Sequence, residues 1–99
     1  MSLEILEKLY EVVSDRKRKP VEGSYTCKLF EKGLDEILRK VGEEAVELIL
    51  AGKSLSRDQV VYEAADLLYH VIVLLVYEDI ELEEVMGELE RRRGERGNR

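Results

Sequence analysis

Three observations on the sequence predict an all-α domain. Apolar residues recur every three or four positions along most of the chain, which is the period of one helix face. The 99 residues include one proline and one phenylalanine, with 44% apolar and 38% charged residues, and this composition suits helices better than a sandwich. Glycines and capping residues divide the periodic segments into about five helices, and we expect an antiparallel bundle.

The first two helices are expected at 2–14 and 24–32. In the first, apolar residues step by three and four, and Ser2 stands at the N-cap. The segment between the helices, "DRKRKPVEGS", mixes four basic residues with proline and glycine and predicts an exposed loop. The second helix is short and is expected to end at Gly33.

The third and fourth helices carry the strongest signals. Residues 34–51 place six apolar side chains within an arc of about 100°, and Gly52 is the expected stop. The arc consists of Leu34, Ile37, Leu38, Val41, Ala45 and Leu48. "SRDQ" at 56–59 has the form of a capping box, so the fourth helix is expected from there to about residue 78.

A last helix is expected at 82–92, with an apolar side formed by Leu82, Val85, Met86 and Leu89. No repeat or second domain is visible. We therefore expect one domain over 1–93 and a flexible basic tail over 94–99.

The run "VVYEAADLLYHVIVLLVY" at 60–77 is apolar nearly all round, so it must be buried on every side. Four other short helices can hardly bury it, and we expect a second copy of the chain, most simply in a two-fold dimer. A membrane span is the alternative. Its two acids and histidine would each cost on the order of 2 to 3 kcal/mol at a bilayer centre, which disfavours insertion.

Charge and cysteine content narrow the function classes. A net charge of −6 argues against a general nucleic-acid binder, which needs basic surface to displace counterions. The single cysteine, Cys27, excludes an internal disulfide and fits a reducing compartment. The first residues carry acids within their apolar period, unlike a signal peptide, so cytoplasm is expected.

Acidic residues form two i, i+3 pairs, Glu44 with Glu47 and Glu63 with Asp66. The first pair is expected beside the edge of its apolar arc, with Glu43 one step further towards solvent. The second pair lies among apolar residues. Two antiparallel helices that each offer such a pair would form a cage of oxygen ligands, which suits Mg²⁺ or Mn²⁺.

Two plainer interpretations stay open. The acids of the third helix form an ordinary solvated face in the first, and in the second Glu63 and Asp66 form salt bridges to Lys40 or Arg39.

The pattern E-E-x-x-E, fifteen residues, then E-x-x-D resembles the signature of the all-α nucleoside triphosphate pyrophosphohydrolases, which are helical, oligomeric, Mg²⁺-dependent enzymes. The flanking segments "GSYTCKLFEKGLDEILRKVGEEAVELILA" and "VYEAADLLYHVIVLL" are similar to the phosphoribosyl-ATP pyrophosphohydrolases of histidine biosynthesis. This similarity covers about 3–92. One departure is "EDI" at 78–80, which lacks a glycine often found at that turn.

The resemblance implies hydrolysis of phosphoribosyl-ATP to phosphoribosyl-AMP and pyrophosphate, the second step of histidine biosynthesis, by metal-assisted attack of water at the α phosphorus. The implied metal ligands are Glu44, Glu47, Glu63 and Asp66, with Mg²⁺ or Mn²⁺ as cofactor. The implied catalytic residues are Glu43, as a base or an outer-sphere ligand, and Lys40, as a phosphate contact.

Candidate substrate contacts are Ser24, Tyr25, Thr26, Lys28, Arg16, Lys17 and His70. The first three open a helix, where free N–H groups favour an anion, although Ser24 also suits a plain N-cap. The two basic residues belong to the expected loop, which either closes over the ribosyl phosphate or is merely solvated. His70 either contacts substrate, supports the metal ligands, or is a core histidine.

Two further functions stay open. One is a housekeeping pyrophosphatase for free or modified nucleoside triphosphates, which shares the acids and needs no basic loop. The other is a non-catalytic helical module for dimerisation or metal binding.

Overall fold

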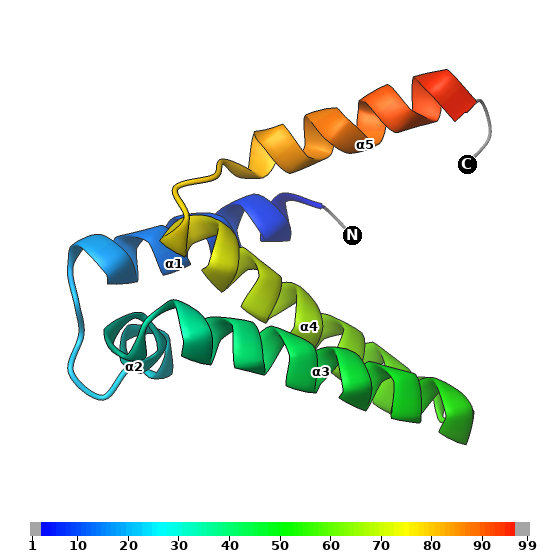
Figure 1. Cartoon of the computed structure of the whole chain (residues 1–99), viewed down its shortest axis with the longest axis horizontal. Coiled ribbons are helices and arrows are strands. Elements are labelled where there is room, and N and C mark those ends of the chain that lie inside the picture. The colour runs from blue at the N-terminus through cyan, green and yellow to red at the C-terminus, as the bar shows by residue number, and fades with distance from the viewer. Residues whose placement is uncertain (1–2, 97–99) are drawn as a thin grey trace.

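The computed structural model describes residues 3–96 and consists of helices joined by short connections. The helices are α1 (Glu4–Arg18), α2 (Tyr25–Lys32), α3 (Leu34–Ser54), α4 (Arg57–Tyr77) and α5 (Leu82–Arg96). α3 and α4 form a long antiparallel pair, α1 and α2 pack at one end of it, and the start of α5 lies near α1 (Figure 1). The part of the chain that is described contains no strand, so the all-α class is confirmed.

The end of α1 corrects one prediction, because residues 15–18 are helical and not part of a loop. Three basic residues occupy the last turn, where positive charge is favoured by the partial negative charge of the helix C-terminus. The helix stops just before Pro20, which cannot continue it. Ser2, the predicted N-cap, lies outside the described residues. At the other end of the chain, α5 continues to Arg96, past the predicted end of the last helix.

Capping residues determine the other helix ends. The hydroxyl of Ser24 accepts from the backbone N–H of Cys27, and the hydroxyl of Ser56 accepts from that of Gln59, so both predicted starts are confirmed. Gly33 separates α2 from α3 with a φ of 92°, a conformation that side chains disfavour.

The predicted stop at Gly52 is wrong. α3 continues to Ser54 and ends at Leu55, which takes the left-handed conformation. The Ser54 hydroxyl donates to the carbonyl oxygen of Ala51 and accepts from the N–H of Ser56. These two bonds satisfy backbone groups that the helix end leaves free, which accounts for the longer helix.

The core lies where the C-terminal half of α4 meets α1, α2 and α3. Its buried members are Val13, Leu29, Ile37, Ile72, Val73 and Val76. Lys17 holds α1 to the end of α4: its ammonium donates to the carbonyl oxygens of Val76 and Tyr77 and pairs with Asp79. The N-terminal half of α4 is left with α3 as its main partner, and the predicted acidic pairs are found there.

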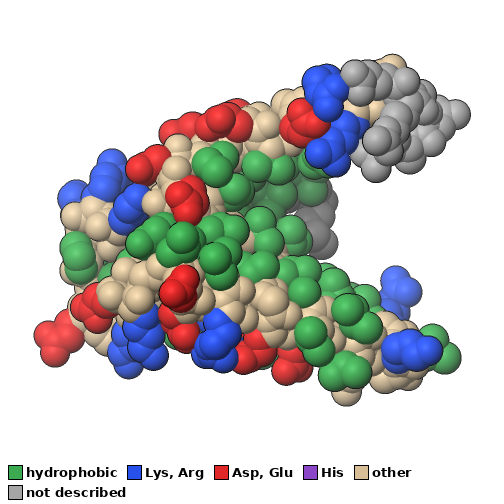
Figure 2. Space-filling view, viewed as in Figure 1, with side chains coloured by type: hydrophobic (Ala, Val, Ile, Leu, Met, Phe, Trp, Pro, Cys, Tyr) green, Lys and Arg blue, Asp and Glu red, His purple; other side chains and the backbone are tan. Residues whose placement is uncertain are grey.

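α4 is the one helix in the described range 3–96 that is long and apolar enough, by length and composition, to cross a membrane. It packs along α3 and across α1. Even so, much of its apolar surface is exposed in a single chain, together with apolar residues of α3 and α5. Figure 2 shows hydrophobic side chains along the hollow between the α5 arm and the α3–α4 pair.

The cap at the start of α4 generates a stability prediction. Ser56→Ala removes the acceptor of the Gln59 N–H and should lower the free energy of unfolding by about 1 kcal/mol. Ser56→Asp keeps an acceptor there and should retain most of the stability. Urea unfolding at one protein concentration measures both variants, and equal losses would contradict the cap.

Candidate functional site

Glu44 lies at the centre of the buried face of α3, not beside its edge as predicted. Ile37 and Ala51, each two turns away on this face, are buried, and Glu44 itself is 6% exposed. Leu38, which the predicted arc included, is half exposed. The buried face is therefore rotated away from Leu38, and it places a carboxyl group inside the α3–α4 contact.

Asp66 of α4 meets Glu44 across this contact. Burial is the main cause that raises the pKa of Glu44, and a hydrogen bond between the two carboxyl groups raises it further. Lys40 opposes this effect, with its ammonium 3.2 Å from Glu44 Oε1. Two carboxyl groups of the predicted cage are thus in direct contact, and one cation partly balances their charge.

Glu63 and Glu47 extend the acidic region along the same two helices. Loss of water raises the pKa of the half-buried Glu63 carboxyl, and the negative charges of Glu47 and Asp66 raise it further. Glu47 is exposed. The structure therefore brings the four predicted acids into one region whose negative charge exceeds its positive charge. A divalent cation would balance it.

The donor atoms in this region favour a hard cation. Glu44, Asp66 and His70 each offer a ligand atom, and the three atoms lie within 4.8 Å of one another. Both nitrogens of His70 are engaged, however: Nδ1 lies 2.8 Å from the backbone oxygen of Asp66, and Nε2 lies 2.9 Å from the Tyr25 hydroxyl. Carboxylate oxygens are left, and these fit Mg²⁺ or Mn²⁺.

The two plainer interpretations of the acids fare differently. A solvated face describes Glu43 and Glu47, which are exposed, but not Glu44. Lys40 pairs with Glu43 and Glu44, and Arg39 pairs with Glu36 and Glu43. Within residues 3–96 neither cation pairs with Glu63 or Asp66, so salt bridges to Lys40 or Arg39 do not explain the acids of α4. The Asp66 carboxylate instead lies 3.4 Å from Nδ1 of His70.

Glu43 is held between two cations. Its carboxylate accepts from Arg39 at 2.7 Å and from Lys40 at 2.9 Å. The hydrogen bond from Lys40 is the main cause that holds the pKa of Glu43 below its usual range. This geometry disfavours Glu43 as a proton acceptor and makes it an anchor for the Lys40 ammonium.

The start of α2 contacts α4 through two hydroxyl groups. The Tyr25 hydroxyl bonds to His70, and the Thr26 hydroxyl bonds to that of Tyr69. Ser24 acts as the N-cap, which was the alternative to a phosphate contact, and Lys28 is exposed. Tyr25 thus lies next to the acidic region, while Thr26 is buried between the two helices.

The basic residues predicted to close over the substrate lie elsewhere in a single chain. Lys17 is engaged at the C-terminus of α4, eleven residues beyond Asp66, which is about 16 Å along the helix axis. Arg16 pairs with its neighbour Asp15. Neither residue is beside the acids, and their substrate roles stay predictions.

Comparison with known proteins identifies the family. Residues 6–93 match the family model of phosphoribosyl-ATP pyrophosphohydrolase. The chain belongs to this family. A phosphoribosyl-ATP pyrophosphatase of Geobacter sulfurreducens is 54% identical over 95 residues, which cover 96% of this chain and 88% of the relative. One of Clostridium acetobutylicum is 53% identical over 89 residues, which cover 90% and 81%.

A histidine biosynthesis bifunctional protein HisIE of Caldanaerobacter subterraneus subsp. tengcongensis is 59% identical over 90 residues. The match covers 91% of this chain but 44% of that relative. The chain thus spans less than half the length of the bifunctional members that it matches and most of the length of the shorter ones.

Sequence reasoning missed two contacts of this candidate site. The ion pair of Lys40 with Glu44 had a signal, because the residues are spaced i, i+4 on one helix. The bond between Tyr25 and His70 had none, because 45 residues separate them and only the packing of α2 on α4 joins them.

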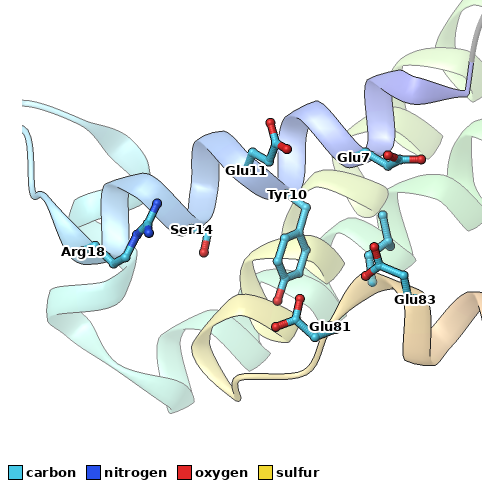
Figure 3. Close-up of a pocket in the computed structure, with 8 residues that line it drawn as sticks. Glu7, Tyr10, Glu11, Ser14, Arg18, Glu81 and Glu83 are labelled. Atoms are coloured by element: carbon cyan, nitrogen blue, oxygen red, sulfur yellow. The ribbon is translucent and has the colours of Figure 1, made fainter.

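A separate hollow lies between α1 and the start of α5, with a volume of about 260 Å³ (Figure 3). Its lining is acidic and includes Glu7, Glu11, Glu81 and Glu83 around Tyr10, whose hydroxyl donates to the backbone oxygen of Ile80. None of the predicted site residues lines it, so the hollow and the acids of α3 and α4 are distinct.

The raised pKa of Glu44 generates a pH prediction. The buried carboxyl binds its proton more tightly in the folded chain than at its ordinary value of 4.5, so stability falls as the pH rises from about 4.5 through the folded pKa. Glu44→Gln removes this loss. The variant should gain unfolding free energy relative to the parent between pH 4 and pH 7, measured by urea with chelator present. Parallel pH profiles for parent and variant would count against a buried, charged Glu44.

Proposed function

We propose that this chain hydrolyses phosphoribosyl-ATP to phosphoribosyl-AMP and pyrophosphate, by metal-assisted attack of water at the α phosphorus, as a step of histidine biosynthesis. The carboxyl pair between α3 and α4, formed by the buried Glu44 and the partly exposed Asp66, carries the proposal. The family match over 6–93 and the names of the relatives support this choice of substrate. We also place the protein in the cytoplasm, in keeping with its single buried thiol.

The proposed ligands of Mg²⁺ or Mn²⁺ are Glu44, Glu47, Glu63 and Asp66. A cation bound there supplies charge neutralisation on the phosphate oxygens. Lys40 holds a second positive charge beside the ligands, because Glu43 and Glu44 fix its ammonium from two sides. Its place favours the phosphate contact predicted for it, with Glu43 as its support.

A free nucleoside triphosphate is the second candidate substrate. The observation that favours it is the position of Lys17, which is engaged at the far end of α4 and leaves the acids without the basic residues expected for a ribosyl phosphate. The two substrates therefore have to be compared directly.

We further propose that two copies pair through the exposed face of α3. Leu38, Val46 and Ile49 form an exposed apolar stripe there, and Gly42 lies within the stripe. A mid-helix glycine costs about 1 kcal/mol relative to alanine, and a Cβ at Gly42 would have no neighbour within 4 Å among the described residues. Close approach of a partner helix accounts for this glycine, because a side chain here would keep the two helices apart.

The proposed activity predicts how a variant of a proposed metal ligand behaves. Pyrophosphate release from phosphoribosyl-ATP should require Mg²⁺ and stop with chelator, and release from ATP should be much slower. Glu63→Gln should keep its helical circular dichroism and lose at least about 100-fold in activity, since outer-sphere changes alone cost 10- to 100-fold. Glu83→Gln, in the separate acidic hollow, is the control.

The outcomes of this assay separate the candidates. Faster turnover of ATP would replace the substrate and keep the metal site. No release from either nucleotide would favour the non-catalytic module. Full activity of Glu63→Gln would remove Glu63 from the ligand set.

The dimer proposal has a matched pair of variants. Val46 and Val12 are similarly exposed, at 54% and 51%, but only Val46 lies in the α3 stripe. Val46→Glu should reduce the mass in solution from that of two chains to that of one, because a carboxylate cannot be buried unpaired in an apolar interface. Val12→Glu should leave the mass unchanged. Light scattering after size exclusion measures both, and a monomeric parent would reject the dimer.

A further inference from the structure

His70 is enclosed at the junction of α2 and α4. Its side chain is 2% exposed, and the rings of Tyr25 and Tyr69 meet it edge-on at centroid distances of 5.8 and 5.0 Å. Each ring nitrogen has one hydrogen-bond partner at normal distance: Nδ1 the backbone oxygen of Asp66, and Nε2 the Tyr25 hydroxyl. The Asp66 carboxylate, a second group that can only accept when ionised, lies 3.4 Å from Nδ1. The position of every proton in this small network can be worked out from these partners.

The carbonyl oxygen fixes the tautomer. It carries no proton and can only accept, so Nδ1 at 2.8 Å must be the donor. A neutral imidazole has one N–H, so Nε2 carries no proton and can only accept a hydrogen bond. The Tyr25 hydroxyl, 2.9 Å away, must then donate its single proton to Nε2. The opposite tautomer would place two lone pairs against each other at Nδ1.

We propose that His70 is a positioning residue whose Nε2 accepts the hydrogen bond of the Tyr25 hydroxyl, so that Tyr25 faces the acidic region only as a hydrogen-bond acceptor and orients the attacking water there. His70 itself binds neither metal nor phosphate, because no nitrogen is free. Tyr25 cannot donate to a phosphate oxygen, because its only proton is committed. The part about the water rests on the proposed function.

The surroundings of Tyr25 suit an acceptor that receives a hydrogen bond from water. Tyr25 is 47% exposed, so part of the residue stays open to solvent while its hydroxyl bonds to His70. Burial of the hydroxyl raises the pKa of Tyr25, as do Tyr69 and the nearby Asp66 and Glu44, whereas Lys40 lowers it. Tyr25 therefore lies among the groups that would hold the phosphates and the water, and it stays a neutral phenol.

The first test uses the fact that the sequence contains one histidine. In protein labelled with ¹⁵N-histidine at pH 8, where an imidazole is ordinarily neutral, the spectrum should show a proton on Nδ1 and none on Nε2. Tyr25→Phe should shift the Nε2 resonance towards that of an unbonded nitrogen and leave Nδ1–H in place. Tyr62→Phe, an exposed tyrosine of α4, should change neither.

Added Mg²⁺ should leave the Nδ1–H tautomer intact. A proton on Nε2, or an identical Nε2 resonance in the parent and Tyr25→Phe, would overturn the proposal. Loss of the Nδ1 proton on addition of Mg²⁺ would make His70 a ligand and would also overturn it.

The second test is kinetic. Tyr25→Phe should lower kcat about tenfold with KM within about twofold, whereas a raised KM at unchanged kcat would make Tyr25 a substrate contact and refute its role towards water. His70→Gln, which retains an acceptor near Nε2, should keep more of kcat than His70→Leu; equal losses with both folds intact would refute the role of Nε2. If the parent releases no pyrophosphate, the proposed function fails and the imidazole spectrum still decides the proton positions.

Discussion

The contact between α3 and α4 around Glu44 and Asp66 is the constraint on which the rest of the site depends. Carboxyl groups are normally excluded from the contact between two packed helices, because a buried charge without a partner is costly. Here a carboxyl lies at the centre of the buried face of α3, in contact with a second one. The helices can keep this arrangement only if protons, Lys40 or a bound cation balance the charge.

The two halves of α4 have different roles, one in stability and the other in the candidate site. Its C-terminal half supplies buried residues to the core and is fixed by the Lys17 ammonium. Its N-terminal half packs mainly on α3 and presents Glu63 and Asp66 to that side. The uncompensated acids are therefore held on a helix whose position is determined a few turns away, where burial of apolar surface stabilises it.

Hydrogen bonds from α2 complete the site. Its short helix starts at a serine cap, and its first two residues bond to α4 through hydroxyl groups. Gly33 then turns the chain so that α3 returns along α4. The loop, the cap and the turn thus place Tyr25 beside acids that follow it by 19 to 41 positions in the sequence.

The sequence by itself determined the helices, most of their starts, and the acids of the site, because period, caps and i, i+3 spacing are local. It misplaced two helix ends. α1 continues into the predicted loop because basic residues favour the helix C-terminus, and α3 continues past Gly52, where the Ser54 hydroxyl bonds to the backbone. Only the tertiary structure decided that Glu44 is central and buried and that His70 bonds to Tyr25. These depend on how α2 and α3 are rotated against α4, which no local pattern specifies.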